Sequence, residues 1–213
     1  MKIQLNQVVP EPLAHVLEGN SEIWSTSVAF EPGKRYQVHA PSGKGKSTFI
    51  HILYGIRHDY EGEVLIDGQD IPQIKKSRWA GMRQQDISIV FQDLRLFMDL
   101  TARENIQVKA VLYKDNLEEE ISRMAELLGV THVLDKKAAL LSYGERQRVA
   151  IIRALIQPFQ VLLLDEPFSH LDEGNIQKAC ELMDEKCRQN NATMIMTSLG
   201  YPYFLEFDQK LVL

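Results

Sequence analysis

The chain has 213 residues, a formal net charge of −5, 45% hydrophobic residues and 25% charged residues, which is the composition of an ordinary globular protein. This length allows one domain with a large core. The acidic balance argues against binding of nucleic acid through its phosphates. No apolar run approaches the ~20 residues that span a bilayer, and the N-terminus lacks the apolar core of a secretory signal. We therefore expect a cytoplasmic protein that reaches a membrane only through a partner, without inserting into it.

The N-terminal forty residues alternate polar and apolar positions between proline and glycine turn signals, which is typical of antiparallel strands. Trp24 falls in this region, and we expect it on a strand with its side chain in the core. A short strand over residues 36–39 precedes a helix over 46–54. Two further strands are expected over 63–66 and 87–90.

The pattern changes at about residue 94, and residues 94–157 read almost entirely as helix. Apolar side chains recur there near the helical period, as at Leu117, Ile121 and Met124. Cys180 and Cys187 lie in a later helical stretch, on one face, and we expect two reduced thiols. The remaining predictions are strands over 161–164, 193–197 and 210–213, and a helix over 173–190. Strands that alternate with helices indicate an α/β fold with a mainly parallel sheet covered on both faces.

A phosphate-binding loop is indicated by residues 40–48, APSGKGKST, which follow the pattern G-x-x-x-x-G-K-[ST] between a strand and a helix. Ala40 replaces the first glycine, and alanine fits this turn if its φ stays negative. The main-chain N–H groups would cradle phosphate oxygens, Lys46 would reach the β- and γ-phosphates, and Ser47 could coordinate Mg²⁺. A flexible surface turn is the structural alternative. The predicted phosphate-binding residues are Ala40, Pro41, Ser42, Gly43, Lys44, Gly45, Lys46, Ser47 and Thr48.

These features predict an α/β P-loop NTPase with a mainly parallel sheet, an N-terminal antiparallel β part and an inserted helical subdomain. We expect one domain over residues 1–213. Its nucleotide-binding core would comprise residues 1–93 and 158–213, and the helical subdomain would comprise residues 94–157.

Two adjacent acids end the apolar run VLLLDE at residues 161–166. The carboxyl end of a buried strand is where open α/β sheets bind ligands. Asp165 would hold Mg²⁺ through water, and Glu166 would accept a proton from the attacking water. A solvent-facing polar strand end is the alternative, and the nearby phosphate loop argues against it.

A helix start is encoded by LSYGERQR at residues 141–148, where Ser142 and Glu145 form the capping-box pattern. Capping alone would explain these residues. The same helix N-terminus could also bind an anion. Since the chain has its own phosphate loop, that anion would be the nucleotide of a neighbouring subunit.

Five motifs together resemble the ATP-binding cassette ATPases, the nucleotide-binding subunits of ABC transporters. In family order these are APSGKGKST as Walker A, FQD as the Q-loop, LSYGE as the signature, VLLLDEP as Walker B and SHLD as the D-loop. The resemblance covers nearly the whole chain. The compact length and FQDLRLFMDLTARENI are similar to the small cassettes of lipoprotein release, cell division and macrolide export.

The resemblance implies a head-to-tail dimer, either of two copies or with a paralogue, in which each ATP lies between Walker A and the partner's signature helix. Ser142 and Gly144, beside Glu145, would contact the γ-phosphate across the dimer. Gln92 would touch Mg²⁺ or the attacking water and report to a transmembrane permease. Glu166 would be the general base. ATP and Mg²⁺ are the implied cofactors, with Ser47, Gln92 and Asp165 as metal-binding residues, and the implied location is the inner face of the cell membrane.

Three departures from the family pattern stand out. Tyr143 occupies the middle glycine position of the signature and Glu145 its glutamine position. No aromatic residue before the phosphate loop is a clear candidate to stack on adenine. Ser198, in MTSLG, stands where the family has a histidine that contacts the γ-phosphate. His170 in the D-loop is a possible substitute across the dimer, although a packed or solvated side chain also explains it.

Two functions follow from these departures. The first is an ATPase that drives a membrane permease, with slow hydrolysis because Ser198 is shorter than histidine and uncharged. The alternative is an ATP-gated regulatory or interaction subunit with little or no hydrolysis. A soluble cassette protein without a permease is a third possibility, but such proteins usually carry two cassettes in one chain.

Overall fold

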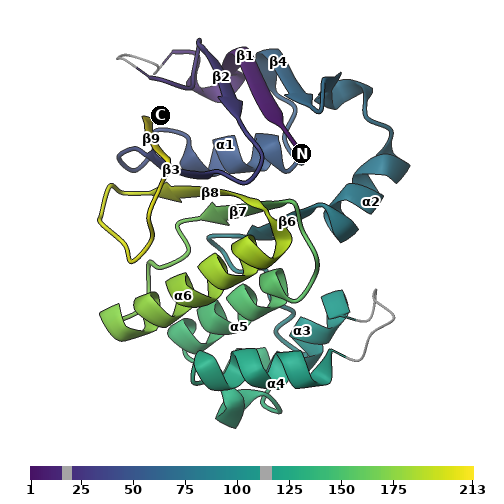
Figure 1. The fold of residues 1–213 in the computed structure, drawn as a ribbon, viewed down its shortest axis with the longest axis vertical. Coiled ribbons are helices and arrows are strands. Elements are labelled where there is room, and N and C mark those ends of the chain that lie inside the picture. The colour runs from purple at the N-terminus through teal and green to yellow at the C-terminus, as the bar shows by residue number, and fades with distance from the viewer. Residues whose placement is uncertain (16–20, 111–116) are drawn as a thin grey trace.

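The computed structural model describes residues 1–15, 21–110 and 117–213, and these form two sheets joined to a group of helices (Figure 1). The first sheet is antiparallel in the order β2-β1-β4-β5. Its strands are β1 (Ile3–Pro10), β2 (Ser27–Phe30), β4 (Tyr60–Ile66) and β5 (Gln69–Asp70). The second sheet is parallel in the order β6-β7-β8-β3-β9. Its strands are β3 (Arg35–His39), β6 (Ile87–Val90), β7 (Val161–Asp165), β8 (Thr193–Ser198) and β9 (Gln209–Val212).

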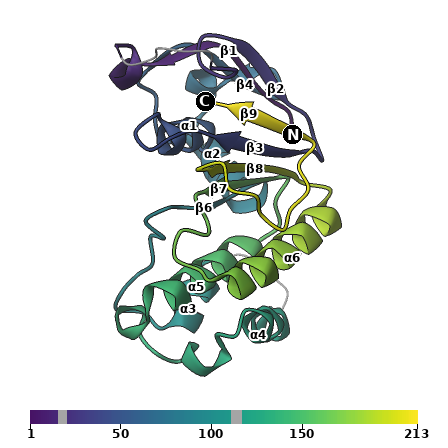
Figure 2. The same ribbon diagram turned by 90° about the vertical axis from the view of Figure 1, so that its left-hand side faces the viewer.

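Helices cover both faces of the parallel sheet, as the alternating pattern predicts. Helix α1 lies between the two sheets, and α5 and α6 lie against the opposite face of the parallel sheet (Figures 1 and 2). The α-helices are α1 (Lys46–Leu53), α2 (Lys76–Gln85), α3 (Ala102–Ala110), α4 (Glu118–Leu127), α5 (Tyr143–Leu155) and α6 (Glu173–Asn190). The predicted fold class is confirmed, and α6 has the predicted bounds.

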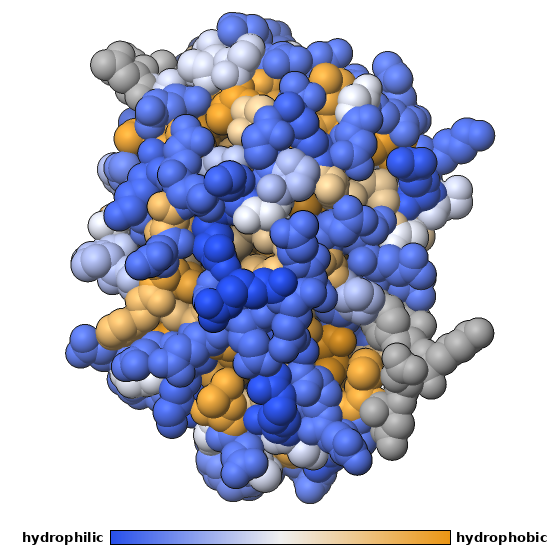
Figure 3. Space-filling model, viewed as in Figure 1, coloured by the Kyte–Doolittle hydropathy of each residue, from blue (hydrophilic) through white to orange (hydrophobic). Residues whose placement is uncertain are grey.

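The core consists of two apolar clusters, one on each face of the parallel sheet. Successive residues of β7 enter them in turn, since Leu162 and Leu164 pack with α5 and α6, and Val161 and Leu163 pack on the side of α1. This arrangement explains why the central strands are continuous apolar runs. On the face in Figure 3, hydrophilic side chains predominate and apolar side chains form separate groups between them.

The helical prediction for residues 94–157 is wrong in extent, because α3 begins only at Ala102. The Asn105 side chain accepts a hydrogen bond from Phe97 N and donates to the main-chain oxygens of Phe97 and Thr101, which holds the chain before α3 in a loop. Thr101 and Glu104 exchange capping hydrogen bonds at the start of the helix. Side-chain bonds to the main chain therefore replace helix there.

Trp24 is buried at 2% exposure, as expected, but it lies in a turn before β2 and the predicted strand position is wrong. It packs edge-on against Phe49 of α1. Cys180 and Cys187 are free and buried on α6, and burial raises both thiol pKa values to about 12. Within the described ranges, no helix is long and apolar enough to cross a membrane.

Candidate nucleotide-binding and hydrolysis site

The phosphate loop connects β3 to α1 with two glycines at positive φ, Gly43 at 79° and Gly45 at 94°. The positive φ of Gly45 requires glycine here, and a Cβ at this position would also displace the end of the Leu13 side chain, whose Cδ1 would lie 2.4 Å away. Ala40 is buried and is absent from the described residues with positive φ, which meets the condition for alanine at that position. The turn therefore has the conformation that the motif predicts.

A cavity of about 250 Å³ lies over this loop. Eight predicted site residues line it together with Leu13, namely Ser42, Gly43, Gly45, Lys46, Ser47, Thr48, Gln92 and Glu166. Gln92 lies at the start of the segment after β6. Pro41 is exposed and Lys44 is partly exposed on the same loop. The structure therefore brings the Walker A, Q-loop and Walker B residues together.

The Lys46 side chain is only 4% exposed, and its ammonium group is fully partnered. It donates to the main-chain oxygens of Ala40 at 2.8 Å and Pro41 at 3.0 Å. Its third close partner is Glu166, with 3.2 Å between Lys46 Nζ and Glu166 Oε1. Lys46 of Walker A and Glu166, the second acid of Walker B, thus form an ion pair across the cavity.

Four oxygen-bearing side chains, from α1, the segment after β6, β7 and β8, form two hydrogen-bonded pairs here. The Ser47 hydroxyl donates to Gln92 Oε1 at 3.2 Å, and Thr197 Oγ1 donates to Asp165 Oδ1 at 2.9 Å. Asp165 is 1% exposed. Burial raises the pKa of the Asp165 carboxyl, against the opposing effect of hydrogen bonds from Ser47 and Thr197. A buried carboxylate beside a hydroxyl and an amide oxygen is a donor set that suits a hard divalent cation.

The signature helix α5 begins with the predicted capping box, in which Ser142 and Glu145 bond reciprocally. The hydrogen bonds from Ser142 lower the pKa of the Glu145 carboxyl. A Cβ on Gly144 would lie 3.2 Å from the main-chain oxygen of His170, so the helix start approaches the D-loop closely. Among the described residues, none of these three signature positions lines the cavity over its own phosphate loop.

Tyr143 is more than a tolerated replacement, because it bridges two loops of its own chain. Its hydroxyl donates to the main-chain oxygen of Gln92 at 3.1 Å, and its ring lies 3.9 Å from that of His170. With Ser47, Asp165 and Gln92 it also lines a neighbouring cavity of about 360 Å³. Its position therefore connects the signature helix to the oxygen cluster.

Ser198 ends β8 and is buried, at 1% exposure. Its hydroxyl accepts hydrogen bonds from Gln37 Nε2 and from Gly200 N, each at 3.2 Å. It lines neither of the two cavities described above. The hydroxyl is thus occupied in holding the strand end and the following turn.

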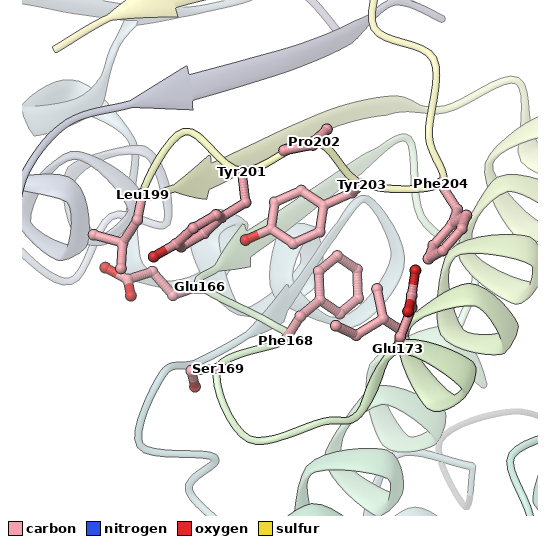
Figure 4. Close-up of a pocket in the computed structure, with 10 residues that line it drawn as sticks. Glu166, Phe168, Ser169, Glu173, Leu199, Tyr201, Pro202, Tyr203 and Phe204 are labelled. Atoms are coloured by element: carbon pink, nitrogen blue, oxygen red, sulfur yellow. The ribbon is translucent and has the colours of Figure 1, made fainter.

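Several residues at the site carry no motif and were missed from the sequence. Leu13 lies against the phosphate loop, and Thr197 bonds both Asp165 and the main-chain nitrogen of Glu166. Tyr201 and Tyr203 face Glu166 from the segment after β8 (Figure 4). Only Thr197 could have been found from the sequence, because it lies at the end of an apolar run that is predicted to be a strand.

Comparison with known proteins agrees with this geometry. Residues 24–169 match the ABC transporter family. The chain is 34% identical over 190 residues to the lipoprotein-releasing system ATP-binding protein LolD of Legionella pneumophila (strain Lens), covering 87% of this chain and 83% of LolD. This chain belongs to the ABC transporter family.

Other relatives show how far the cassette extends. It is 33% identical over 175 residues to the ABC transporter ATP-binding protein YxdL of Bacillus subtilis (strain 168), covering 81% of the cassette and 68% of YxdL. The dimeric cassette MJ0796 superposes with a TM-score of 0.77 at 27% identity, covering 92% of the cassette and 88% of MJ0796. A bacterial Atm1-family exporter with ATP bound superposes with a TM-score of 0.79 at 28% identity, and the match covers the whole cassette but 36% of the exporter.

Proposed function

We propose that this cassette binds ATP with Mg²⁺ between two head-to-tail subunits and hydrolyses it to drive a membrane permease. The observation that carries the proposal is the meeting of Lys46, Ser47, Gln92 and Glu166 around one cavity over the phosphate loop, with Asp165 beside it. These groups come from three separate stretches of the chain, at residues 46–47, 92 and 165–166. Their common purpose is the binding and cleavage of a phosphate chain.

Phosphate binding would use the loop from Ala40 to Thr48. Its main-chain N–H groups and the N-terminus of α1 offer positive partial charge to the phosphates. Lys46 would leave its ion pair with Glu166 and bind the β- and γ-phosphates. Leu13, which packs against Gly45, would offer adenine an apolar contact in place of a stacking aromatic ring.

Ser47, Gln92 and Asp165 would hold Mg²⁺, with Asp165 acting through water. When bound, the ion would neutralise the negative charge that develops on the phosphate oxygens. Asp165 is held in place by Thr197, so its orientation does not depend on the metal. Among the described residues, no group of three or more His, Cys, Asp or Glu side chains is placed to hold a metal ion.

Hydrolysis would use Glu166 as the proton acceptor. As the water oxygen bonds to the γ-phosphorus, the bond from that phosphorus to the oxygen of the departing ADP breaks. Glu166 takes the proton from the water. Lys46 stabilises the charge on the transferred phosphoryl group.

The second subunit would complete the site with Ser142, Gly144 and Glu145. These residues form a capped helix N-terminus that does not face its own phosphate loop, so an anion from another subunit can reach it. MJ0796 is a dimer, which supports the same assembly here. Two copies of this chain or this chain and a paralogue would both satisfy the geometry.

The permease would dock in a groove between α1, α3 and α5, and this contact would place the cassette on the inner face of the membrane. Phe97 and Val108 are exposed at its rim, at 55% and 40%. Lys109 and Arg153 also line it, and their hydrogen bonds to described residues go to main-chain oxygens. Burial lowers the pKa of Lys109 and lowers that of Arg153 to about 10, so a carboxylate from a partner would be favoured here.

This docking can be tested with Lys109→Glu, compared with Lys210→Glu at an exposed position on β9. Co-purification with the membrane permease should fall at least tenfold in the first variant and stay unchanged in the second. Equal retention of the permease by both variants would place the docking surface elsewhere.

The buried Ser198 hydroxyl favours a second function, an ATP-gated regulatory subunit with little turnover. Mg²⁺-dependent ATP hydrolysis by the purified cassette, with nucleotide binding measured in parallel, distinguishes the two. Turnover well above that of Glu166→Gln supports the motor. Binding without turnover, even in membranes that contain the permease, supports the regulatory subunit.

A further inference from the structure

A further cavity, of about 610 Å³, lies beside Glu166 and is distinct in chemistry from the phosphate site. It is enclosed by the segment after β7, the start of α6 and the segment after β8 (Figure 4). Its walls are largely aromatic, with Phe168, Tyr201, Tyr203 and Phe204. Glu166 is thus shared between an ionic site on one side and an aromatic cavity on the other.

Two phenol groups in this cavity are directed at the carboxylate. In Figure 4 the Tyr201 hydroxyl points to Glu166, and the Tyr203 hydroxyl points along the cavity in the same direction, beside the Tyr201 ring. The Tyr203 ring packs against Phe168 with centroids 4.9 Å apart, and the main-chain oxygen of Tyr201 accepts from Gln37 Nε2 at 3.2 Å. Burial raises the pKa of Tyr203, and the charge of Glu166 raises it further. The Tyr203 ring is therefore anchored and its phenol lies in the field of the acid, whereas Tyr201 is held through its main chain and is 61% exposed.

The three N–H donors of Lys46 determine which of its partners a bound nucleotide can displace. A lysine ammonium has three N–H donors. In this structure Lys46 directs them at Ala40 O, Pro41 O and the Glu166 carboxylate. Two of these acceptors are main-chain atoms of the loop itself, so the partner that a phosphate oxygen can displace is the side chain of Glu166.

A displaced carboxylate needs new hydrogen-bond donors, because an unpaired buried charge is costly. The Ser198 hydroxyl at the neighbouring strand end does not supply one, since it is buried at 1% exposure and lines neither cavity beside Glu166. The hydroxyls of Tyr201 and Tyr203 are the donors that face it.

We propose that nucleotide binding transfers Glu166 from Lys46 to the hydroxyls of Tyr201 and Tyr203, which act as positioning residues for the carboxylate. Two phenols that donate to the carboxylate leave it with free lone pairs for the water proton. The two tyrosines would thereby hold the catalytic geometry that the family histidine at position 198 would otherwise hold. This inference rests on the proposed hydrolysis for its consequence, and the movement itself can be observed without turnover.

The kinetic test compares Tyr201→Phe, Tyr203→Phe and the double variant with Tyr60→Phe, whose phenol lies on β4 away from the site. The double variant should lower kcat on the order of tenfold to a hundredfold, with KM within twofold of wild type. The acidic limb of its pH–rate profile should move to higher pH, because lost hydrogen bonds to a carboxylate raise its pKa. Wild-type kcat with an unmoved acidic limb in the double variant would overturn the proposal and leave the ATPase function intact.

The second test needs no hydrolysis. Tyrosinate absorbance is titrated with and without Mg²⁺ and a non-hydrolysable ATP analogue, whose binding is verified by calorimetry. The analogue should raise the pKa of the phenols that Tyr201→Phe and Tyr203→Phe identify, and Glu166→Gln should abolish this rise. If the analogue binds and the titration is unchanged, the proposal is wrong. If the rise occurs in a protein that shows no turnover, the transfer of Glu166 is supported and the proposed hydrolysis is wrong.

Discussion

The carboxyl ends of β7 and β8 lie side by side in the parallel sheet, and they carry different side chains. β7 ends in Asp165 and the following Glu166, which face the two cavities at the phosphate loop. β8 ends in Ser198, whose hydroxyl turns inward to Gln37. A position at the carboxyl end of a strand therefore does not by itself make a residue part of the site. Whether its side chain faces the site depends on the hydrogen bonds that it already makes.

Glu166→Gln should have the largest effect on this comparison, since it removes the proposed proton acceptor at the end of β7. We expect kcat for ATP hydrolysis to fall about 10²- to 10⁴-fold with nucleotide affinity retained. Glu173→Gln, at the other end of the aromatic cavity, is the matched control and should keep wild-type turnover. Comparable losses in both variants would show that the cavity, and not the acid beside Lys46, limits hydrolysis.

Ser198→Ala should change stability more than catalysis. Removing the hydroxyl leaves Gln37 Nε2 and Gly200 N without this acceptor, which costs about 1–3 kcal/mol of unfolding free energy. Urea denaturation measures the loss, and kcat should change less than threefold. The double variant Gln37→Leu/Ser198→Ala should lose less than the sum of the single variants. A kcat loss as large as that of Glu166→Gln would assign the hydroxyl a direct role.

Asp165→Asn should raise the melting temperature of the nucleotide-free protein by a few degrees at neutral pH. Burial raises the pKa of Asp165 above its ordinary 3.8, so the folded state holds the proton more tightly than the unfolded chain. Stability is therefore lost as pH rises from that value through the folded pKa. The same variant should lose the stabilisation by ATP and Mg²⁺.

The control for this pH dependence is Asp208→Asn, where the sign is opposite. Hydrogen bonds from Arg35 and Lys34 lower the pKa of Asp208, so its contribution is lost as pH falls. Melting curves from about pH 2 to pH 7 compare the two variants, because the Asp208 contribution is lost below its ordinary pKa of 3.8 and that of Asp165 above the same value. Parallel behaviour in the two would contradict burial as the cause at Asp165.

Tyr143→Phe should have the smallest effect, about 0.5–1 kcal/mol or less, because it removes one exposed hydrogen bond to the main-chain oxygen of Gln92. Through this bond Tyr143 holds the segment that follows β6, the strand next to β7. Chemical denaturation measures the change. Tyr143→Ala, which also removes the ring packed on His170, should cost more, and equal losses would mean that the ring contact contributes nothing.

The local motifs and their elements were predictable from the sequence, because each depends on residues close together in the chain. The turn at Gly45 follows from glycine's access to positive φ, and the capping box from the spacing of Ser142 and Glu145. The helix α6 follows from periodic apolar positions after an Asp172 cap. The loop before α3 was not predictable in this way, because the Asn105 side chain replaces helical hydrogen bonds with its own.

Only the tertiary structure decided the contacts between distant segments. The ion pair of Lys46 with Glu166 joins two motifs. Each motif can be recognised in the sequence, but their contact cannot. The burial of Ser198 depends on Gln37, a residue on a neighbouring strand. Tyr201 and Tyr203 carry no motif, and they face the acid because the segment after β8 returns over the end of β7. Such contacts depend on how strands are ordered in the sheet, and that order is set by packing of the whole core, which no local pattern encodes.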